Sequence, residues 1–260
     1  MTLETSFLPG ADRQQQILDL IERQQRLSVA EICAQFAVSE ATARRDLETL
    51  AAQGKVQRVH GGAIALPKAP PEQPILERQD EQASDKIRIG QAAAQLVGDG
   101  ETIFLGSGTT VLEVARALRK HAGLTVITNS LPVLNTLSGL PEVTVIALGG
   151  MLRDSELSFI GHITEQALAE VRADKVIIGT RAISLEHGLT NDYLPETLTD
   201  RAILKAGREV IVAADHTKFG RVAHVLLAPI TSVHTIVTDD QAPSDFVKSV
   251  QGQRIKVVVA

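Results

Sequence analysis

The chain has 260 residues, of which 44% are hydrophobic and 22% are charged, a composition typical of a globular protein with a sizeable core. The single cysteine, Cys33, excludes a disulfide framework and a cysteine-based zinc site. No run of about 18 consecutive apolar residues occurs, so we expect no membrane-spanning helix. Residues 1–10 have no signal-peptide pattern, and we therefore expect a cytoplasmic protein.

The net charge of −5 is spread over the whole chain. Residues 1–66 hold 7 Lys and Arg against 8 Asp and Glu, and residues 67–260 hold 19 against 23. Neither part is basic enough to indicate nucleic-acid binding by its overall charge. Between residues 44 and 60, however, the chain has four cationic and only two anionic side chains, which predicts a small positive stripe.

A proline-rich stretch divides the chain. Residues 67–74 hold four prolines in eight positions, a density that neither a helix interior nor a central strand tolerates. We therefore predict a first domain at residues 1–66, a semi-extended linker at residues 67–80 and a second domain at residues 81–260.

The first sixty residues have the periodicity of three short helices. An apolar stripe predicts the first helix over residues 12–25. Ser28, with Glu31 three positions on, forms a capping box for the second helix, and Ser39 caps a third that reaches about residue 53. The third helix carries Thr42 and Arg45 on its outward face.

This arrangement is that of a helix-turn-helix motif, in which the last helix enters the major groove of DNA. There an arginine makes bidentate contacts to guanine and a threonine methyl contacts thymine. Residues 55–60 alternate like a strand before Gly61-Gly62 turns the chain back, so Arg58 and His60 would meet the phosphate backbone. The alternative is a three-helix structural or protein-binding module whose arginines are solvated surface charges.

The second domain alternates short β-branched runs with helical patterns, beginning with a helix at residues 84–97. This rhythm predicts a doubly wound α/β fold, a mostly parallel sheet with helices on both faces. In such sheets ligands bind at the carboxyl ends of the strands. The predicted strands are residues 102–105, 124–128, 143–148, 175–179, 210–214, 236–238 and 255–259.

The strand at residues 102–105 runs into a glycine-rich loop and then a helix. Gly106 and Gly108 permit a tight turn, and the helix start with the hydroxyl groups of Ser107, Thr109 and Thr110 can cradle an anion. The loop lacks the Gly-Lys-Ser/Thr ending of a P-loop and the third glycine of a dinucleotide fingerprint. The alternative is a plain glycine-rich turn.

Other polar loops follow other predicted strands and should converge on the same edge of the sheet. Lys218 would supply positive charge for a phosphate or carboxylate, or is a solvent-exposed lysine. Gly149-Gly150 could instead form a simple turn, and Asn129 could cap the next helix. The predicted effector-binding residues are Gly106, Ser107, Gly108, Thr109, Thr110, Asn129, Ser130, Gly149, Gly150, Asp215 and Lys218.

Two sets of motifs carry a resemblance to a known family. The string SEATARRDL at residues 39–47, followed by Arg-Val-His-Gly-Gly at residues 58–62, resembles the winged helix-turn-helix of the DeoR family of bacterial sugar-metabolism repressors. The strings at residues 105–110, 128–130, 148–150 and 215–219 resemble the effector domain of that family. Together they cover nearly the whole chain from Asp12 onward.

The resemblance implies that Thr42, Arg44 and Arg45 contact DNA while Asp46 holds the arginine side chains in place. It also implies an effector domain similar to ribose-5-phosphate isomerase and glucosamine-6-phosphate deaminase folds, with a phosphorylated sugar in the loop at residues 106–110. We therefore predict a homodimeric or homotetrameric repressor of a sugar or sugar-acid catabolic operon, which the phosphorylated effector releases from double-stranded operator DNA. The predicted DNA-contacting residues are Ser39, Thr42, Arg44, Arg45, Arg58 and His60.

The chain departs from the family pattern at residues 180–183 and at Asp200. Either the effector is unusual, or these are surface positions whose sequence has drifted without effect on function. The rival hypothesis is a sugar-phosphate isomerase or deaminase with an appended helix-turn-helix. The acid–base candidates for such an enzyme have no recognisable catalytic spacing. A third hypothesis is a coenzyme A transferase, which would need a glutamate nucleophile that we cannot nominate. We expect no enzyme activity, no cofactor and, because no histidine pair has metal-ligand spacing, no metal. The acid–base candidates are His187, Asp192, Glu196 and Asp215.

Replacing Arg45 with alanine should weaken operator binding by about 1–3 kcal/mol if its guanidinium reads a base. Fluorescence anisotropy against operator and mismatched DNA measures the loss. Unchanged affinity together with unchanged sequence preference would remove Arg45 from the DNA contacts.

Overall fold

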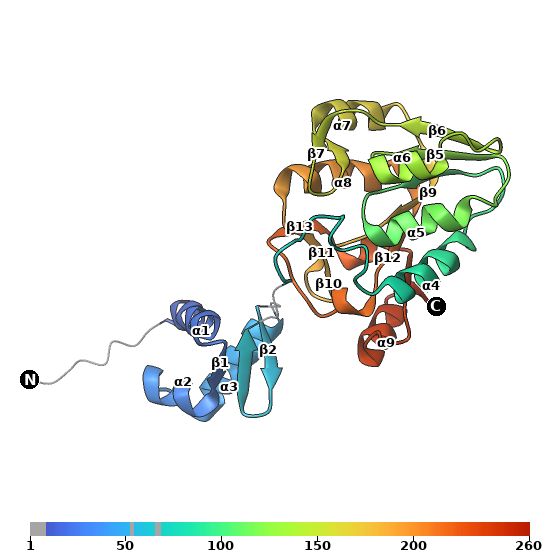
Figure 1. Cartoon of the computed structure of the whole chain (residues 1–260). Helices are drawn as coiled ribbons and strands as arrows, with labels where there is room; N and C mark the ends of the chain where they lie inside the picture. The colour runs from blue at the N-terminus through green and yellow to red at the C-terminus, as the bar shows by residue number, and fades with distance from the viewer. Residues whose placement is uncertain (1–8, 53–54, 66–68) are drawn as a thin grey trace, which may run out of the picture. The chain divides into compact units, whose positions relative to one another are not determined.

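The computed structural model describes residues 9–52, 55–65 and 69–260. The chain divides into two compact units, Met1–Pro67 and Lys68–Ala260 (Figure 1). The end of the third predicted helix at residue 53, and residues 67 and 68 of the predicted linker, lie outside the described residues.

The first unit is a winged helix-turn-helix. Its predicted helices and hairpin are confirmed as α1 (Gly10–Gln24), α2 (Val29–Phe36), α3 (Glu40–Ala52), β2 (Val56–Val59) and β3 (Gly62–Ala65). A strand that we did not predict, β1 (Arg26–Ser28), pairs with β3 in an antiparallel sheet of order β1-β3-β2. Three residues are too few to show a strand pattern, and β1 forms because Leu27 packs into the core beside Ala63.

Side-chain caps start α2 and α3. The Ser28 hydroxyl accepts from the Glu31 backbone N–H at 3.2 Å, and the Glu31 carboxylate accepts from the Ser28 N–H at 2.7 Å, so the predicted capping box is confirmed. The Ser39 hydroxyl likewise accepts from the Thr42 N–H at 3.3 Å. The core beneath these helices is aliphatic, with Ile17, Ile21, Ile32, Leu47 and Leu50 almost completely buried.

A buried ion pair joins α1 to α3 and corrects the role expected of Asp46. Asp46 lies 2.7 Å from Arg13 Nε and also accepts from the Gln14 amide at 2.9 Å. It therefore holds Arg13 rather than Arg44 or Arg45. The reason is its position beside Leu47 on the inward flank of α3, which turns its carboxylate toward α1.

The second unit is built on a seven-stranded sheet in which every pair of neighbouring strands is parallel. All seven predicted strands are present, in the order β15-β14-β12-β9-β4-β5-β6. From β4 the chain adds two strands on one side and then, beginning with β9, four on the other. The strands are β4 (Thr102–Leu105), β5 (Leu124–Thr128), β6 (Val143–Ala147), β9 (Ala173–Ile178), β12 (Gly207–Ala213), β14 (Thr235–Thr238) and β15 (Lys256–Val259).

Helices cover both faces of this sheet, which confirms the doubly wound fold (Figure 1). One aliphatic core packs α4 (Ala83–Ala94), α5 (Thr109–Leu118) and α6 (Leu131–Leu137) against one face. The other core packs α7 (His162–Ala169), α8 (Leu194–Ala206) and α9 (Ser244–Gly252) against the opposite face. None of the helices in the described ranges is long and apolar enough to cross a bilayer.

Several short elements lie outside the seven-stranded sheet and were not predicted, because each is only three or four residues long. They are the hairpin β7 (Met151–Arg153) with β8 (Ser158–Ile160), the sheet of β10 (Ala182–Ser184), β11 (Gly188–Asn191) and β13 (Val225–Ala228), and the 3-10 turns η1 (His216–Lys218) and η2 (Ile230–Ser232).

Residues 69–80, which we name the strap, pack onto the second unit instead of forming the semi-extended linker that their prolines predict. The Ala69 N–H donates to the Val222 carbonyl at 3.0 Å, and the Ile75 N–H donates to the Ser155 carbonyl at 2.7 Å. Ile75 is almost completely buried. The prolines keep the strap out of helix and sheet, while its apolar and charged side chains attach it to the protein.

Replacing Asp46 with alanine removes the carboxylate that neutralises the buried Arg13. We expect the first unit to lose about 3–5 kcal/mol of stability, measured as faster hydrogen–deuterium exchange in α1 and α3. Glu48→Ala, which removes an exposed carboxylate from the same helix, should change stability by less than about 0.5 kcal/mol. Equal exchange in the two variants would show that the ion pair does not hold α1 to α3.

Candidate functional site

A cavity opens at the carboxyl ends of the three central strands β4, β9 and β12. This is the point where the order of strands reverses, and open α/β sheets bind their ligands there. The space not filled by atoms amounts to about 680 Å³ including the open mouth.

One side of the cavity has the donors expected of an anion cradle. Ser107, Gly108, Thr109 and Thr110 line it where β4 passes into α5. Gly108 has φ of +110°, a backbone conformation that favours glycine. No side chain caps the first turn of α5, so its backbone N–H groups can bind an anion beside the threonine hydroxyls.

Two lysines add positive charge to this side. Lys218, from η1, and Lys86, from α4, both line the cavity. Burial lowers the pKa of each, whereas the nearby Asp215 carboxylate opposes the shift. Lys86 was not predicted, although it stands three positions before the buried Ile89, where a helix stripe would place an apolar residue.

The other side of the cavity is acidic. Arg78, from the strap, pairs with Glu156, and Arg153 pairs with both Glu72 and Glu196. Burial raises the pKa of Glu156 to about 7 and also raises the pKa of Glu196. Sequence reasoning missed most of these residues because single charged positions in loops carry no pattern. The carboxyl groups that line this side are Glu72, Glu156, Glu196 and Asp200.

Three of the five positions where the chain departs from the family pattern line this cavity. Thr180, Arg181 and Asp200 are all among its lining residues. Arg181 is buried and lies 3.1 Å from Asp192, and its guanidinium also bonds the Pro70 carbonyl of the strap. These residues are therefore not drifting surface positions. Of the four acid–base candidates, Glu196 alone is part of the lining among the described residues.

The loops after β5 and β6 do not reach the cavity, because these strands lie at one side of the sheet. The Asn129 amide donates to the Phe159 carbonyl at 3.0 Å, and Ser130, rather than Asn129, caps α6. The Gly149 carbonyl accepts from the Thr164 hydroxyl at 2.8 Å. Gly150 has φ of +147°, and a Cβ there would lie 2.2 Å from that hydroxyl oxygen.

Two further predicted residues support the cavity without lining it. The Gly106 N–H donates to the Ile177 carbonyl at 3.0 Å and closes the end of β4 against β9. Asp215 is buried and accepts from the Thr217 N–H at 3.0 Å, which caps η1. Of the predicted effector set, the structure thus brings Ser107–Thr110 and Lys218 together at one surface.

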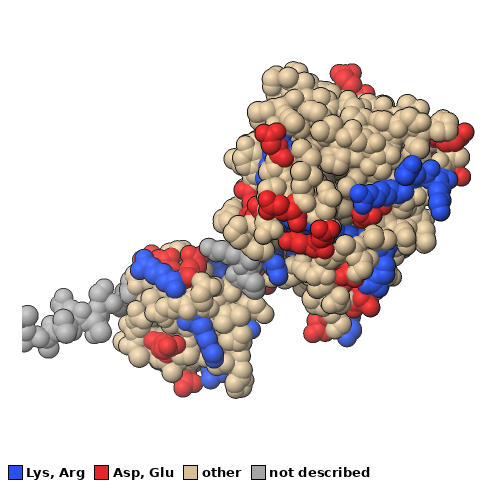
Figure 2. Space-filling model, in the orientation of Figure 1, with Lys and Arg blue, Asp and Glu red and all other residues tan. Residues whose placement is uncertain are grey.

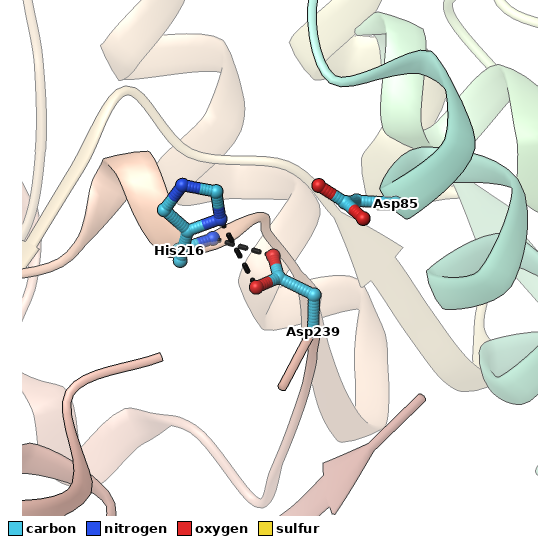
Figure 3. Close-up of side chains that lie close together, drawn as sticks. All are labelled: Asp85, His216 and Asp239. Atoms are coloured by element: carbon cyan, nitrogen blue, oxygen red, sulfur yellow. Dashed lines mark hydrogen bonds and ion pairs between the residues drawn. The ribbon is translucent and has the colours of Figure 1, made fainter. Parts of the chain in front are cut away.

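A second group of ionisable side chains stands beside η1 (Figure 3). Candidate ligand atoms of Asp85, His216 and Asp239 lie within 4.8 Å of one another. Asp239 accepts from the His216 backbone N–H at 2.7 Å and lies 3.0 Å from His216 Nδ1, while Arg88 donates to Asp85 at 2.8 Å. The bonds between Asp239 and His216 hold the turn that carries Lys218, while Arg88 on the same helix holds Asp85.

In the first unit, the predicted DNA-contacting residues occupy α3 and the β2–β3 hairpin. Arg44, Arg45 and His60 are exposed, and Arg44 lies 3.2 Å from Glu40. The half-buried Arg58 donates to the Gly62 carbonyl at 3.1 Å. Basic and acidic side chains are mixed on the face of this unit that Figure 2 shows, in keeping with its near-neutral charge.

Comparison with known proteins matches both units. Residues 13–68 match the DeoR-like helix-turn-helix domain, and residues 81–240 match the DeoR C terminal sensor domain. The glycerol-3-phosphate regulon repressor of Escherichia coli is 37% identical over 87% of this chain and 90% of its own length. The transcriptional repressor AccR of Agrobacterium fabrum is 32% identical over 98% of this chain and 99% of its own.

Solved structures with some likeness to this chain include ribose 5-phosphate isomerase A from Neisseria gonorrhoeae. That protein is 17% identical and covers 52% of each chain, with a TM-score of 0.39.

Ionisation of Glu156 should destabilise the second unit. Its pKa is raised in the folded state to about 7 from an ordinary 4.5, so its stabilising contribution is complete below pH 4.5 and is lost as pH rises through 7. The loss amounts to about 3 kcal/mol. The free energy of unfolding can be measured by urea denaturation, followed through the fluorescence of Tyr193, the sole tyrosine. Between pH 5 and 8 this free energy should fall less steeply in Glu156→Gln than in the wild type.

The exposed Glu170 provides the matched control, since Glu170→Gln should keep the pH dependence of the wild type. Parallel curves for Glu156→Gln and the wild type would contradict the assignment.

Proposed function

The chain belongs to the DeoR family of transcriptional regulators, and on this basis we propose that it represses a sugar or sugar-acid catabolic operon until a phosphorylated metabolite binds its second unit. It is a DNA-binding regulator rather than an enzyme, like the named repressors to which it is similar. The sole acid–base candidate in the described cavity lining, Glu196, is held by Arg153 and by the Ser158 hydroxyl.

The anion cradle is the observation that carries the effector part of this proposal. Backbone N–H groups at the start of α5, the hydroxyls of Thr109 and Thr110, and the Lys218 ammonium meet at one cavity. A phosphate monoester matches this combination of donors and charge. The name of the Escherichia coli relative also refers to a phosphorylated metabolite, glycerol-3-phosphate.

We propose that α3 enters the major groove and that the β2–β3 wing contacts the adjacent backbone. The exposure of Arg44, Arg45 and His60 supports this assignment. Ser39 and Thr42 would approach the DNA at the start of α3, where their hydroxyls lie 2.9 Å apart.

The strap offers a physical link between effector binding by the second unit and DNA binding by the first unit. Glu72 and Arg78 line the effector cavity and belong to the segment that continues along the chain into the first unit. An effector that repositions these side chains would change how the strap is held. The population of subunits able to bind DNA would shift accordingly.

We further propose a dimer or tetramer that presents paired winged helices to repeated half-sites. Large apolar side chains exposed on the second unit support its role in subunit contact, because such surfaces mark interaction sites. They include Met151, Leu152, Ile163, Tyr193, Leu194, Leu198 and Leu226.

Fluorescence anisotropy tests the function directly, with labelled DNA from upstream of the chain's own gene and a panel of sugar and sugar-acid phosphates. We expect specific binding that weakens steeply with salt and that one compound abolishes. Absence of specific binding at low salt, or a flat salt response, would count against the repressor on that DNA. Binding that persists against the whole panel would place the effector outside this class.

Replacing Thr109 with glutamate should abolish induction and leave DNA binding intact. The added carboxylate would occupy the cradle and repel a phosphate. Thr231→Glu, which places the same charge at an exposed threonine outside the cavity, should respond to the effector as the wild type does. If Thr109→Glu loses DNA binding as well, the loop has a structural role instead.

A further inference from the structure

The acidic side of the cavity holds more carboxyl groups than cations. Among the described residues, Arg78 pairs with Glu156, and Arg153 is shared between Glu72 and Glu196. Asp200 accepts a hydrogen bond from the neutral Asn191 amide at 2.9 Å. Two guanidinium groups thus serve four carboxyl groups, because the other cations of the lining have carboxylates of their own: Arg181 pairs with Asp192, and Asp215 lies near Lys86 and Lys218. Full ionisation would leave an excess of two negative charges on the acidic side.

Burial makes this excess costly. It raises the pKa of Asp200 well above its usual range, and the negative charge of Glu196 raises it further. A buried carboxyl group in this position either keeps its proton or gains a cation. The cavity is open to solvent, so a ligand can bring that cation.

The side of the cavity formed by the two lysines and the start of α5 favours a negative group instead. Burial lowers the pKa of both Lys86 and Lys218, and no side chain caps the backbone donors at the start of α5. One cavity therefore suits a ligand that carries a negative group beside the lysines and a positive group beside Asp200.

We propose that the effector is a phosphorylated amino sugar, whose phosphate binds the cradle while its ammonium group is held by Asp200 with Glu196. This inference rests on the proposed function, because it assigns the second half of the same effector site. A hydroxyl group at that position would satisfy hydrogen bonds but leave the excess negative charge. An ammonium–carboxylate hydrogen bond is roughly twice as strong as a neutral one.

Isothermal titration of the full-length protein at pH 7 tests the proposal with matched ligand pairs. The pairs are glucosamine 6-phosphate with glucose 6-phosphate, galactosamine 6-phosphate with galactose 6-phosphate, and phosphoethanolamine with ethyl phosphate. We expect the amino member of at least one pair to bind about tenfold tighter or better. Tyr193 gives a second signal, since its ring lies 4.6 Å from the Arg153 guanidinium that holds Glu196.

Asp200→Asn keeps the shape of the side chain and removes its charge. We expect this variant to bring the two affinities of the preferred pair to within about twofold of each other, mainly by weakening the amino ligand. Asp245→Asn, at an exposed position on α9, should retain the full preference. Thermal unfolding of each variant checks that the cavity is still folded, and Glu196→Gln replaces Asp200→Asn if that variant does not fold.

Equal or tighter binding of the member without nitrogen in every pair would overturn the proposal, as would a preference that survives in Asp200→Asn. If phosphate compounds bind and release DNA without any preference for nitrogen, this inference fails and the proposed function stands. If no member of any pair binds, this inference fails, whereas the proposed function is then decided by the anisotropy measurement with the wider panel of sugar and sugar-acid phosphates.

Discussion

The structure around the effector cavity depends on where buried charges find partners. Arg153 on β7 joins the strap through Glu72 and α8 through Glu196, and Arg78 joins the strap to Glu156 in the β7–β8 hairpin. Removing one partner from a buried pair is costly because the remaining charge is stranded. Two guanidinium groups therefore attach three separate segments to one another and set the shape and charge of the acidic side.

The same rule governs the first unit, with a different consequence. The Asp46 carboxylate pairs with Arg13 inside the unit and therefore does not orient Arg44 or Arg45. Those two side chains remain exposed on α3. The acidic residue in the family-like string thus serves the packing of α1 against α3, while its neighbours are left for a partner outside the unit.

Strand order decides which of the polar loops become a site. The ends of β4, β9 and β12 are adjacent, and their loops contribute the cradle, Arg181 and Lys218 to one cavity. β5 and β6 lie to one side, and their loops pack against the β7–β8 hairpin and α7 instead. Asn129 and Gly150 therefore carry structural roles, although each follows a strand in the same way as Ser107 does.

The winged helix-turn-helix, the seven parallel strands and the glycine-rich loop between β4 and α5 could all be predicted from the sequence. Caps, turns and periodic burial depend on residues within a few positions of one another, so a single stretch of chain reveals them. The tertiary structure alone decided that the strap packs, that Asp46 meets Arg13, and that Glu72, Glu156 and Asp200 face the same cavity. These outcomes depend on strand order and on which distant charges share a buried space, and a charged side chain carries no local sign of the partner it will meet.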